Sequence, residues 1–172
     1  MPHLVFAHGN SFPGGTYGVL TRSLEARGFA VQVLDKFGHE PRYQVTNNWP
    51  NLVQQLADFA TAAVERHGEP AFLVGHSLGA LMVSRFAVDA PDMVQQLVLI
   101  SPAGGYGAPA KAEQQAKVRS GRLASLADKG VAGLAAVIDQ RLVSEHGSDL
   151  ARQWVRWNAA RMNAGGYAQA VE

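Results

Sequence analysis

Short apolar runs alternate with amphipathic helical patterns over the first hundred or so residues of this 172-residue chain, and this alternation limits the folds it can adopt. Apolar residues at helical spacing predict the helices, and continuous apolar runs predict buried strands. Strands that are apolar throughout and are joined by helices are typical of a parallel sheet covered on both faces. The predicted strands are 4–7, 29–34, 71–74 and 96–101, and the predicted helices are 16–27, 51–67 and 78–90. We therefore expect an α/β fold with three layers, α/β/α, around a mostly parallel sheet.

The pattern changes after Ser101, where a glycine-rich loop leads into sequence with helical patterns and no strand pattern. The helical patterns cover 110–129, 131–143 and 148–162, and a further one starts at Gly166. We expect residues 1–106 to form the sheet-containing core and residues 107–172 to form a helical lid over it. Three large apolar side chains of this part have the spacing of core residues, although they could also line a pocket: Trp154, Trp157 and Met162. We favour the core.

The composition excludes several kinds of protein. The chain has no cysteine, which rules out disulfides, thiolate zinc sites and a cysteine nucleophile. Its net charge of +1 gives no electrostatic reason to expect a nucleic-acid or membrane partner. The apolar run at 4–7 is too short for a signal peptide or a membrane span. We expect a cytoplasmic protein.

One turn in the sequence contains a candidate catalytic residue. Gly75-His76-Ser77-Leu78-Gly79 fits the pattern G-x-S-x-G and joins the predicted strand 71–74 to the predicted helix 78–90. A strand, a tight turn and a helix in this order hold the serine in a strained conformation with its hydroxyl exposed. A Cβ at Gly75 or Gly79 would crowd this turn. Ser77 is therefore the candidate nucleophile.

A serine hydroxyl needs a base to accept its proton and hydrogen-bond donors for the oxyanion that forms. The backbone N–H of Leu78 directly follows the candidate nucleophile, at the N-terminus of a helix. A second donor is expected from the loop after the first strand, where Asn10 is the best candidate and Gly9 allows close approach. Ligands of parallel sheets bind at the carboxyl ends of the strands, where both loops lie.

Four segments together resemble the α/β-hydrolase superfamily over about residues 3–107. They are the first strand with its loop, Phe6-Ala7-His8-Gly9-Asn10; the loop Asp35-Lys36-Phe37-Gly38-His39; the serine turn 75–79; and the strand 97–103 that leads to the lid. Glu40 stands where the family usually has glycine. The resemblance implies a serine hydrolase that acts on a small carboxylic ester or lactone through an acyl-enzyme on Ser77. It implies a small-molecule, ester-like substrate and no metal or organic cofactor.

The resemblance also implies a triad in the order nucleophile, acid, histidine, with the last two after strands beyond the lid. The chain ends at Glu172 within the lid, and neither Ser101 nor Pro102 can be an alternative acid. We therefore expect the acid, the histidine and the late strands to be missing from this chain, as in a truncated hydrolase. The fourth strand would then be an exposed edge through which the chain is expected to associate, as a homo-oligomer for example.

The sequence has six histidines, and we expect different roles for them. We expect His8 to orient its loop, and His39 and His76 to have structural roles. The other three are expected at the surface: His3, His67 and His146. In one alternative hypothesis the lid folds so that His146, beside Glu145, reaches Ser77 and activates it.

Other functions remain open at this stage. The same sheet and lid could bind a small apolar ligand without turning it over, or could belong to an inactive homologue. The turn around Ser77 is also compatible with acyl transfer, cofactor-free peroxidation or carbon–carbon bond hydrolysis, because it is common to all of these chemistries. A histidine within hydrogen-bond reach of Ser77 would discriminate an enzyme from a binding protein.

Overall fold

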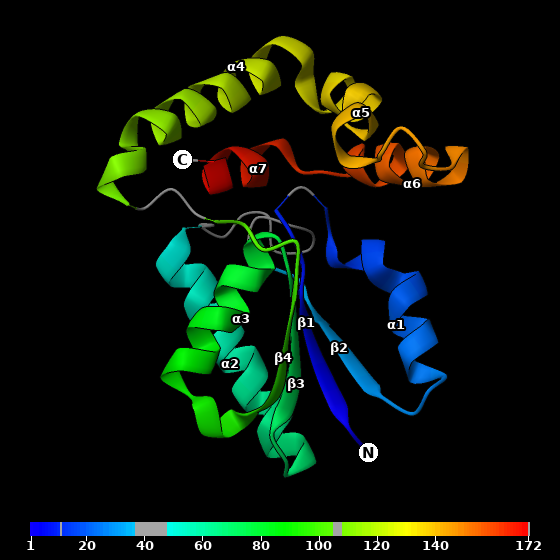
Figure 1. The fold of residues 1–172 in the computed structure, drawn as a ribbon, viewed down its shortest axis with the longest axis vertical. Coiled ribbons are helices and arrows are strands. Elements are labelled where there is room, and N and C mark those ends of the chain that lie inside the picture. The colour runs from blue at the N-terminus through cyan, green and yellow to red at the C-terminus, as the bar shows by residue number, and fades with distance from the viewer. Residues whose placement is uncertain (11, 37–47, 105–107, 172) are drawn as a thin grey trace.

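The computed structural model describes residues 1–10, 12–36, 48–104 and 108–171, and its centre is a four-stranded parallel sheet (Figure 1). The strand order is β2-β1-β3-β4. The strands are β1 (His3–Ala7), β2 (Ala30–Leu34), β3 (Ala71–His76) and β4 (Val94–Ile100). The strand order changes direction between β1 and β3, so the loops after these two strands flank the switch point where ligands of such sheets bind.

Helices cover both faces of the sheet, which confirms the predicted three-layer α/β/α architecture. On one face lie α2 (Trp49–His67) and α3 (Leu78–Asp89); on the other lies α1 (Gly18–Glu25), as Figure 1 shows. Short 3-10 turns precede α1 at Gly14–Tyr17 and β4 at Pro91–Met93. The predicted helix 16–27 is thus partly a 3-10 turn, because the glycine-rich sequence before it does not favour a full α-helical turn.

Residues of β1 alternate between two hydrophobic clusters, one on each face of the sheet. Val5 and Ala7 belong to the larger cluster with α2 and α3, while Leu4 and Phe6 face α1. All four are buried. Full burial of a large apolar side chain contributes roughly 1.5–3 kcal/mol, so β1 contributes to the core on both faces.

Local sequence signals set the ends of α2, the longest helix of the sheet unit (the described residues within 1–104). The side chain of Asn48 accepts a hydrogen bond from the Asn51 N–H at 3.0 Å, as an N-cap residue does. Gly68 ends the helix in the left-handed conformation, at φ 69°. These signals agree with the predicted end of the helix at Gly68.

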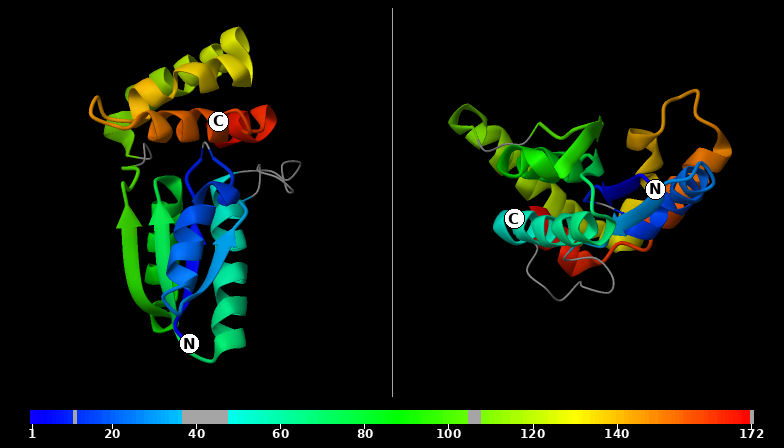
Figure 2. Two further views of the ribbon diagram at one scale, coloured as in Figure 1. Left: turned by 90° about the vertical axis from the view of Figure 1, so that its right-hand side faces the viewer. Right: turned by 90° about the horizontal axis from the view of Figure 1, so that it is seen from below.

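Four helices form the lid (residues 108–171) above the carboxyl ends of the strands (Figures 1 and 2). After a 3-10 turn at Pro109–Lys111 they are α4 (Ala112–Val137), α5 (Asp139–Leu142), α6 (Asp149–Ala159) and α7 (Ala164–Val171). The non-helical Gly130, with φ 60° and ψ −177°, interrupts α4, which confirms the predicted break between the helices 110–129 and 131–143. The part after the break ends at Val137, and the short α5 follows. The expected boundary between residues 106 and 107 falls among residues outside the described ranges.

The two predicted tryptophan core positions in the lid are wrong. Trp154 is 39% exposed and Trp157 is 53% exposed, whereas Met162 is buried as expected. The two indole rings stack on each other with centroids 5.4 Å apart, and the Arg161 guanidinium lies 4.7 Å from the Trp157 centroid. Helical spacing correctly placed both rings on one side of α6, but the described parts of the chain leave that side partly exposed.

β4 is the outer strand of the sheet in the described structure, at its edge in Figure 2. It pairs with β3 only, with a register shift between Ala71 and Phe72. Its apolar side chains from Leu97 to Ile100 are between 36% and 43% exposed. The expectation of an exposed, apolar edge at the fourth strand is confirmed for the described residues.

No helix in the described ranges is both long and apolar enough to span a lipid bilayer.

Candidate active site

Ser77 lies between β3 and α3 in a conformation that few residues adopt. Its φ is 54° and its ψ is −113°, so it has the positive φ that is costly for a residue with a side chain. The Ser77 N–H donates to the Ile100 carbonyl at 3.0 Å. The Ser77 carbonyl accepts from the N–H groups of Ala80, at 3.1 Å, and Ala103, at 3.3 Å. β4 and the segment after it therefore hold the strained turn in place.

The glycines on either side of Ser77 are required by close backbone contacts. A Cβ on Gly75 would lie 2.5 Å from the Gly79 carbonyl oxygen. A Cβ on Gly79 would lie 2.0 Å from the Ala7 carbonyl oxygen, across the sheet in β1. These distances confirm that side chains at the two positions would crowd the turn, and they show that α3 approaches the end of β1 closely.

The loop after β1 lies directly against the serine turn. A Cβ on Gly9 would be 3.4 Å from the Ser77 Cβ and 3.0 Å from the His76 Nδ1. The structure thus brings Gly9 against Ser77 and His76. Asn10, which follows Gly9, and Leu78, which follows Ser77, are both partly buried; that their N–H groups form the oxyanion hole stays a prediction.

Two buried side chains hold the carbonyl of Gly9. His8 Nδ1 lies 2.8 Å from this oxygen, and the Lys36 Nζ donates to it at 2.9 Å. The backbone N–H of Lys36 donates to His8 Nε2 at 3.3 Å, so Nδ1 carries the proton and donates to Gly9. In a trans peptide the C=O and the following N–H point in opposite directions. The N–H of Asn10 consequently points away from Lys36 and His8.

Burial changes the proton affinity of Lys36. The side chain is completely buried, and desolvation lowers the pKa of its ammonium group to about 7. Near neutral pH a large fraction of Lys36 is therefore an uncharged amine, which can still donate a hydrogen bond to Gly9.

Tyr17 connects the start of α1 to the same group of residues. Its hydroxyl lies 2.7 Å from the His76 Nδ1 and is also hydrogen-bonded to the Gly9 backbone. Burial raises the pKa of Tyr17 to about 12, so its hydroxyl keeps its proton. Burial, followed by the nearby Lys36, lowers the pKa of His76, which favours the neutral imidazole. His76 thus has the structural role that we predicted for it, with its Nδ1 engaged by Tyr17.

The hypothesis that His146 activates Ser77 is wrong for this structure. His146 follows α5 in the lid, its side chain is 89% exposed, and its Nε2 lies 3.4 Å from Glu145 Oε1. Across the described ranges, no hydrogen bond joins Ser77 Oγ to a histidine. The role expected for His39 falls outside the described residues.

His3 is buried, so the prediction that it lies at the surface is also wrong. Its ring stacks on His67, at the end of α2, with centroids 4.3 Å apart and an angle of 11° between planes. Burial is the main cause that lowers the pKa of His3, followed by the proximity of His67. The end of α2 covers the first residue of β1, a contact between distant segments that no local pattern indicates.

Sequence reasoning missed Lys36 and the role of Tyr17 in this site. The register of β1 and β2 pairs Ala7 with Leu34, so Lys36 follows β2 at the level where Gly9 follows β1. A lysine two residues after a buried strand, at the carboxyl end of the sheet, was the available signal. No group of three or more histidine, aspartate or glutamate side chains suited to a metal occurs in the described part of the chain.

Comparison with known proteins identifies relatives of the chain. The family model described as serine aminopeptidase, S33, matches residues 2–154. Over 83 residues the chain is 36% identical to the dihydrolipoyllysine-residue acetyltransferase component of the acetoin cleaving system of Cupriavidus necator, covering 46% of this chain and 21% of that protein. Over 104 residues it is 28% identical to a monoglyceride lipase homolog of Monkeypox virus, covering 58% of this chain and 38% of that protein.

Solved structures share the fold over 99% of the chain. MenH from S. aureus has a TM-score of 0.81 at 18% identity, and 65% of that chain is covered. A thermophilic esterase from Thermogutta terrifontis has a TM-score of 0.78 at 18% identity, with 62% covered. An enol-lactonase from Burkholderia xenovorans LB400 has a TM-score of 0.71 at 19% identity, with 63% covered. The chain thus spans less than two thirds of each of these proteins, and at such identities the likeness concerns the fold.

Proposed function

The chain belongs to the serine aminopeptidase S33 family of α/β-hydrolases, and from this premise we propose that it is a serine hydrolase that cleaves small carboxylic esters or lactones. The observation that carries the proposal is the positive φ of Ser77 at the turn between β3 and α3, with Gly9 packed against it. A strained serine at the carboxyl ends of parallel strands is the arrangement that such nucleophiles need. The printed names of its relatives include a lipase homolog, an esterase and an enol-lactonase.

The proposed reaction begins with attack of the Ser77 Oγ on the substrate carbonyl carbon. A base takes the hydroxyl proton, and the carbonyl electron pair moves onto oxygen. The backbone N–H groups of Leu78 and Asn10 donate to this oxyanion. When the tetrahedral intermediate collapses, the alkoxide leaves with a proton and Ser77 carries the acyl group. Water then releases the acid and regenerates the serine.

The second oxyanion donor depends on the orientation of one peptide group. Lys36 and His8 both donate to the Gly9 carbonyl, so the Asn10 N–H is turned away from them. A preorganised donor needs no reorientation when the charge develops, which is the main source of its catalytic effect. We propose Lys36 and His8 as positioning residues for Asn10.

The proposed reaction requires a base that takes the proton of the Ser77 hydroxyl. No such base is among the described contacts of Ser77. Removal of a triad base costs on the order of a million-fold in turnover, although an oxyanion hole and binding alone leave about a thousand-fold over water. Activation of Ser77 is therefore the quantity to measure before any substrate is sought.

The test is the intact mass of the protein after treatment with a fluorophosphonate, with Ser77→Ala as the control. We expect one adduct on the original protein and none on the variant, because only an activated serine reacts rapidly with this probe. Circular dichroism would establish that both proteins are folded. A folded protein that gains no adduct would contradict the hydrolase proposal for this chain.

A non-catalytic binding role is the second candidate function. The observation that favours it is the lack, within the described ranges, of any hydrogen bond from Ser77 Oγ to a histidine. A binding protein would give no adduct with the fluorophosphonate and would bind an ester without consuming it. Equilibrium dialysis with an ester, followed by recovery of intact ester, distinguishes this role from slow hydrolysis.

We further propose that the chain associates with a second copy along β4. This edge strand has a strand partner on one side only in the described structure, and four consecutive apolar side chains on it are exposed. Sedimentation velocity over a range of concentrations should show association that Val98→Lys abolishes. Val88→Lys, at an exposed position of α3, is the matched control and should leave association unchanged. A single monomeric species at all concentrations, with a sharp cooperative melt, contradicts this proposal.

A further inference from the structure

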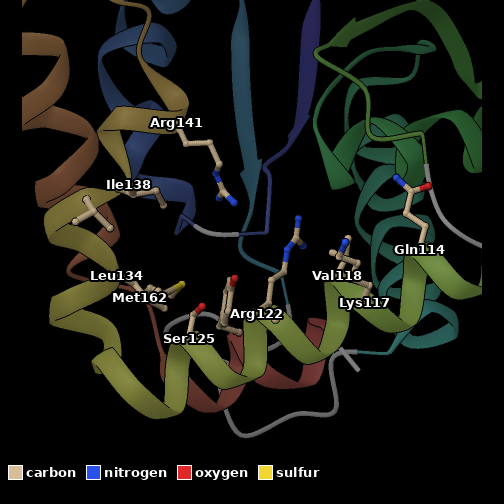
Figure 3. A pocket seen from close by; sticks show the side chains of 12 residues that line it. Gln114, Lys117, Val118, Arg122, Ser125, Leu134, Ile138, Arg141 and Met162 are labelled. Atoms are coloured by element: carbon tan, nitrogen blue, oxygen red, sulfur yellow. The ribbon is translucent and has the colours of Figure 1, made fainter.

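The lid contains an open cavity that no residue of the sheet unit lines. Its volume is about 690 Å³, within the range of about 300–1,000 Å³ that is usual for sites of small organic ligands. It lies between α4, α5 and the beginning of α7, as Figure 3 shows. Its walls are formed by Gln114, Lys117, Val118, Gly121, Arg122, Ser125, Leu134, Val137, Ile138, Arg141, Met162 and Tyr167.

Most residues that line this cavity are cationic or apolar, and the others are Gln114, Gly121, Ser125 and Tyr167. Three are cationic, namely Lys117 and Arg122 from α4 and Arg141 from α5. Figure 3 shows the guanidinium groups of Arg122 and Arg141 reaching into the cavity from their two helices. The apolar side chains are Val118, Leu134, Val137, Ile138 and Met162. None of the twelve lining residues is acidic.

The three cations have no acidic partner in the described ranges, whereas other arginines of the lid do. Arg156 bonds Asp139 through Nε at 2.7 Å and through Nη2 at 2.8 Å, and Arg152 lies 3.9 Å from the same carboxylate. No ion pair of the described residues includes Lys117, Arg122 or Arg141. Asp139 is therefore already engaged, and the cavity combines uncompensated positive charge with apolar walls.

We propose that this cavity binds an amphipathic carboxylate, meaning a carboxylate on an unbranched apolar chain. The guanidinium fork of arginine matches the two oxygens of a carboxylate, and bonds between charged groups are about twice as strong as neutral ones. The apolar chain packs against the methyl and methylene groups of the cavity wall, where it is removed from water. Neither contribution requires an activated Ser77, so the fluorophosphonate test and this proposal can fail separately.

Titration calorimetry of the full chain with decanoate, and with decanol as an uncharged probe of the same length, tests the role of charge. We expect decanoate to bind at least ten-fold more tightly than decanol. Equal affinity for the two probes, or no binding of decanoate, would overturn the proposal. Tighter binding of decyl phosphate than of decanoate would overturn the assignment to a carboxylate.

Variants locate the binding site. Arg122→Gln and Arg141→Gln should each weaken decanoate binding about ten-fold, which corresponds to about 1.4 kcal/mol. Arg119→Gln is the matched control, because Arg119 is an exposed arginine of α4 that does not line the cavity, and it should bind as the original protein does. Equal losses in all three variants would refute a specific site.

Hydrogen exchange and one further variant complete the experiment. Bound decanoate should slow exchange in α4 and α5 and leave β1 and β3 unchanged, even if one arginine variant proves unstable. Ser77→Ala should bind decanoate as tightly as the original protein. Protection confined to the strands, or loss of binding in Ser77→Ala, would place decanoate at the serine turn and overturn the lid site.

Discussion

The sheet unit and the lid of this chain are stabilised in different ways. Sixteen of the twenty buried hydrophobic residues in the described ranges belong to the sheet unit, and four belong to the lid. In the lid, buried polar groups have a larger share, such as Asp139 with Arg156, and Asn158, which accepts from Thr16 Oγ1 at 2.9 Å. The comparison teaches that the sheet holds the serine turn rigidly by packing, while the lid depends on directional contacts between exposed helices.

The largest expected difference in stability between the two units comes from replacing one glycine in each with alanine. In Gly79→Ala the new Cβ would lie 2.0 Å from the Ala7 carbonyl oxygen, a backbone atom of the central strand. We expect a cost beyond the roughly 1–3 kcal/mol typical of overpacking, and a protein that fails to fold. Urea denaturation monitored by circular dichroism measures the effect.

The matched change in the lid is Gly121→Ala, in the middle of α4. No atom lies within 4 Å of the added Cβ. Alanine is favoured over glycine in a helix by roughly 0.5–1 kcal/mol, so this variant should be at least as stable as the original protein. Similar destabilisation by both glycine variants would contradict the contrast between the units.

The next largest difference in stability is expected when one leucine in each unit is replaced with alanine. Leu56 of α2 is 0% exposed in the main hydrophobic cluster, and Leu56→Ala should destabilise by about 2–5 kcal/mol because it leaves a cavity. Leu150 of α6 is 75% exposed, so Leu150→Ala should change stability by less than about 0.5 kcal/mol. Chemical denaturation of both variants checks the pair, and a loss at Leu150 as large as that at Leu56 would contradict it.

In the sheet unit, we expect the free energy of unfolding to depend on pH through Lys36, an effect of intermediate size. Because the pKa of Lys36 falls from 10.5 to about 7 on folding, the unfolded chain binds one more proton between these values. The free energy of unfolding should therefore rise with pH from about 7 towards 10, by at most about 1.4 kcal/mol per pH unit. Below pH 7 the full cost of burying the ammonium group is present.

Lys36→Met provides the control for this pH effect. The variant should lose the rise in stability above pH 7, since methionine has no proton to exchange. In the original protein the rise is measured by urea denaturation at several pH values. A pH profile that is identical in the two proteins would show that Lys36 is not the titrating group.

The smallest change in global stability is expected from a substitution in the lid. In Asp139→Asn the charged bonds with Arg156 are lost, and α6 should exchange its amide hydrogens faster while β1 and β3 are unchanged. Arg156 lowers the pKa of Asp139, so this stabilisation is present above the ordinary aspartate pKa and is lost as the pH falls through the lowered value. Equal acceleration of exchange in β1 would show that the lid and the sheet open together.

Much of the sheet unit could be predicted from the sequence because its signals are local. Continuous apolar runs marked all four strands, and Gly68 marked the end of α2. The turn around Ser77 was predicted from five residues, since only glycine at positions 75 and 79 allows the backbones to approach so closely. The approach of the loop after β1, at Gly9, to Ser77 was expected from the rule that ligands of parallel sheets bind at the carboxyl ends of the strands.

The lid was predicted less well because its contacts are sparse. The helices and the break near Gly130 were found from spacing and composition, but the exposure of Trp154 and Trp157 was not. Spacing identifies which side chains share a face of a helix; whether another layer covers that face depends on the assembly of the whole chain. The cavity beside Arg122 and Arg141 arises in the same way, because Met162 and Tyr167 complete a wall begun by α4 and α5.

By itself, the sequence determined the order of strands and helices and the serine turn, because hydrophobic periodicity and glycine geometry act over a few residues. Only the tertiary structure decided that Lys36 is buried against the Gly9 carbonyl and that Tyr17 reaches His76. These features depend on which strands become neighbours in the order β2-β1-β3-β4. Burial and proton affinity are properties of neighbours brought from distant parts of the chain, so they exist only once the sheet has formed.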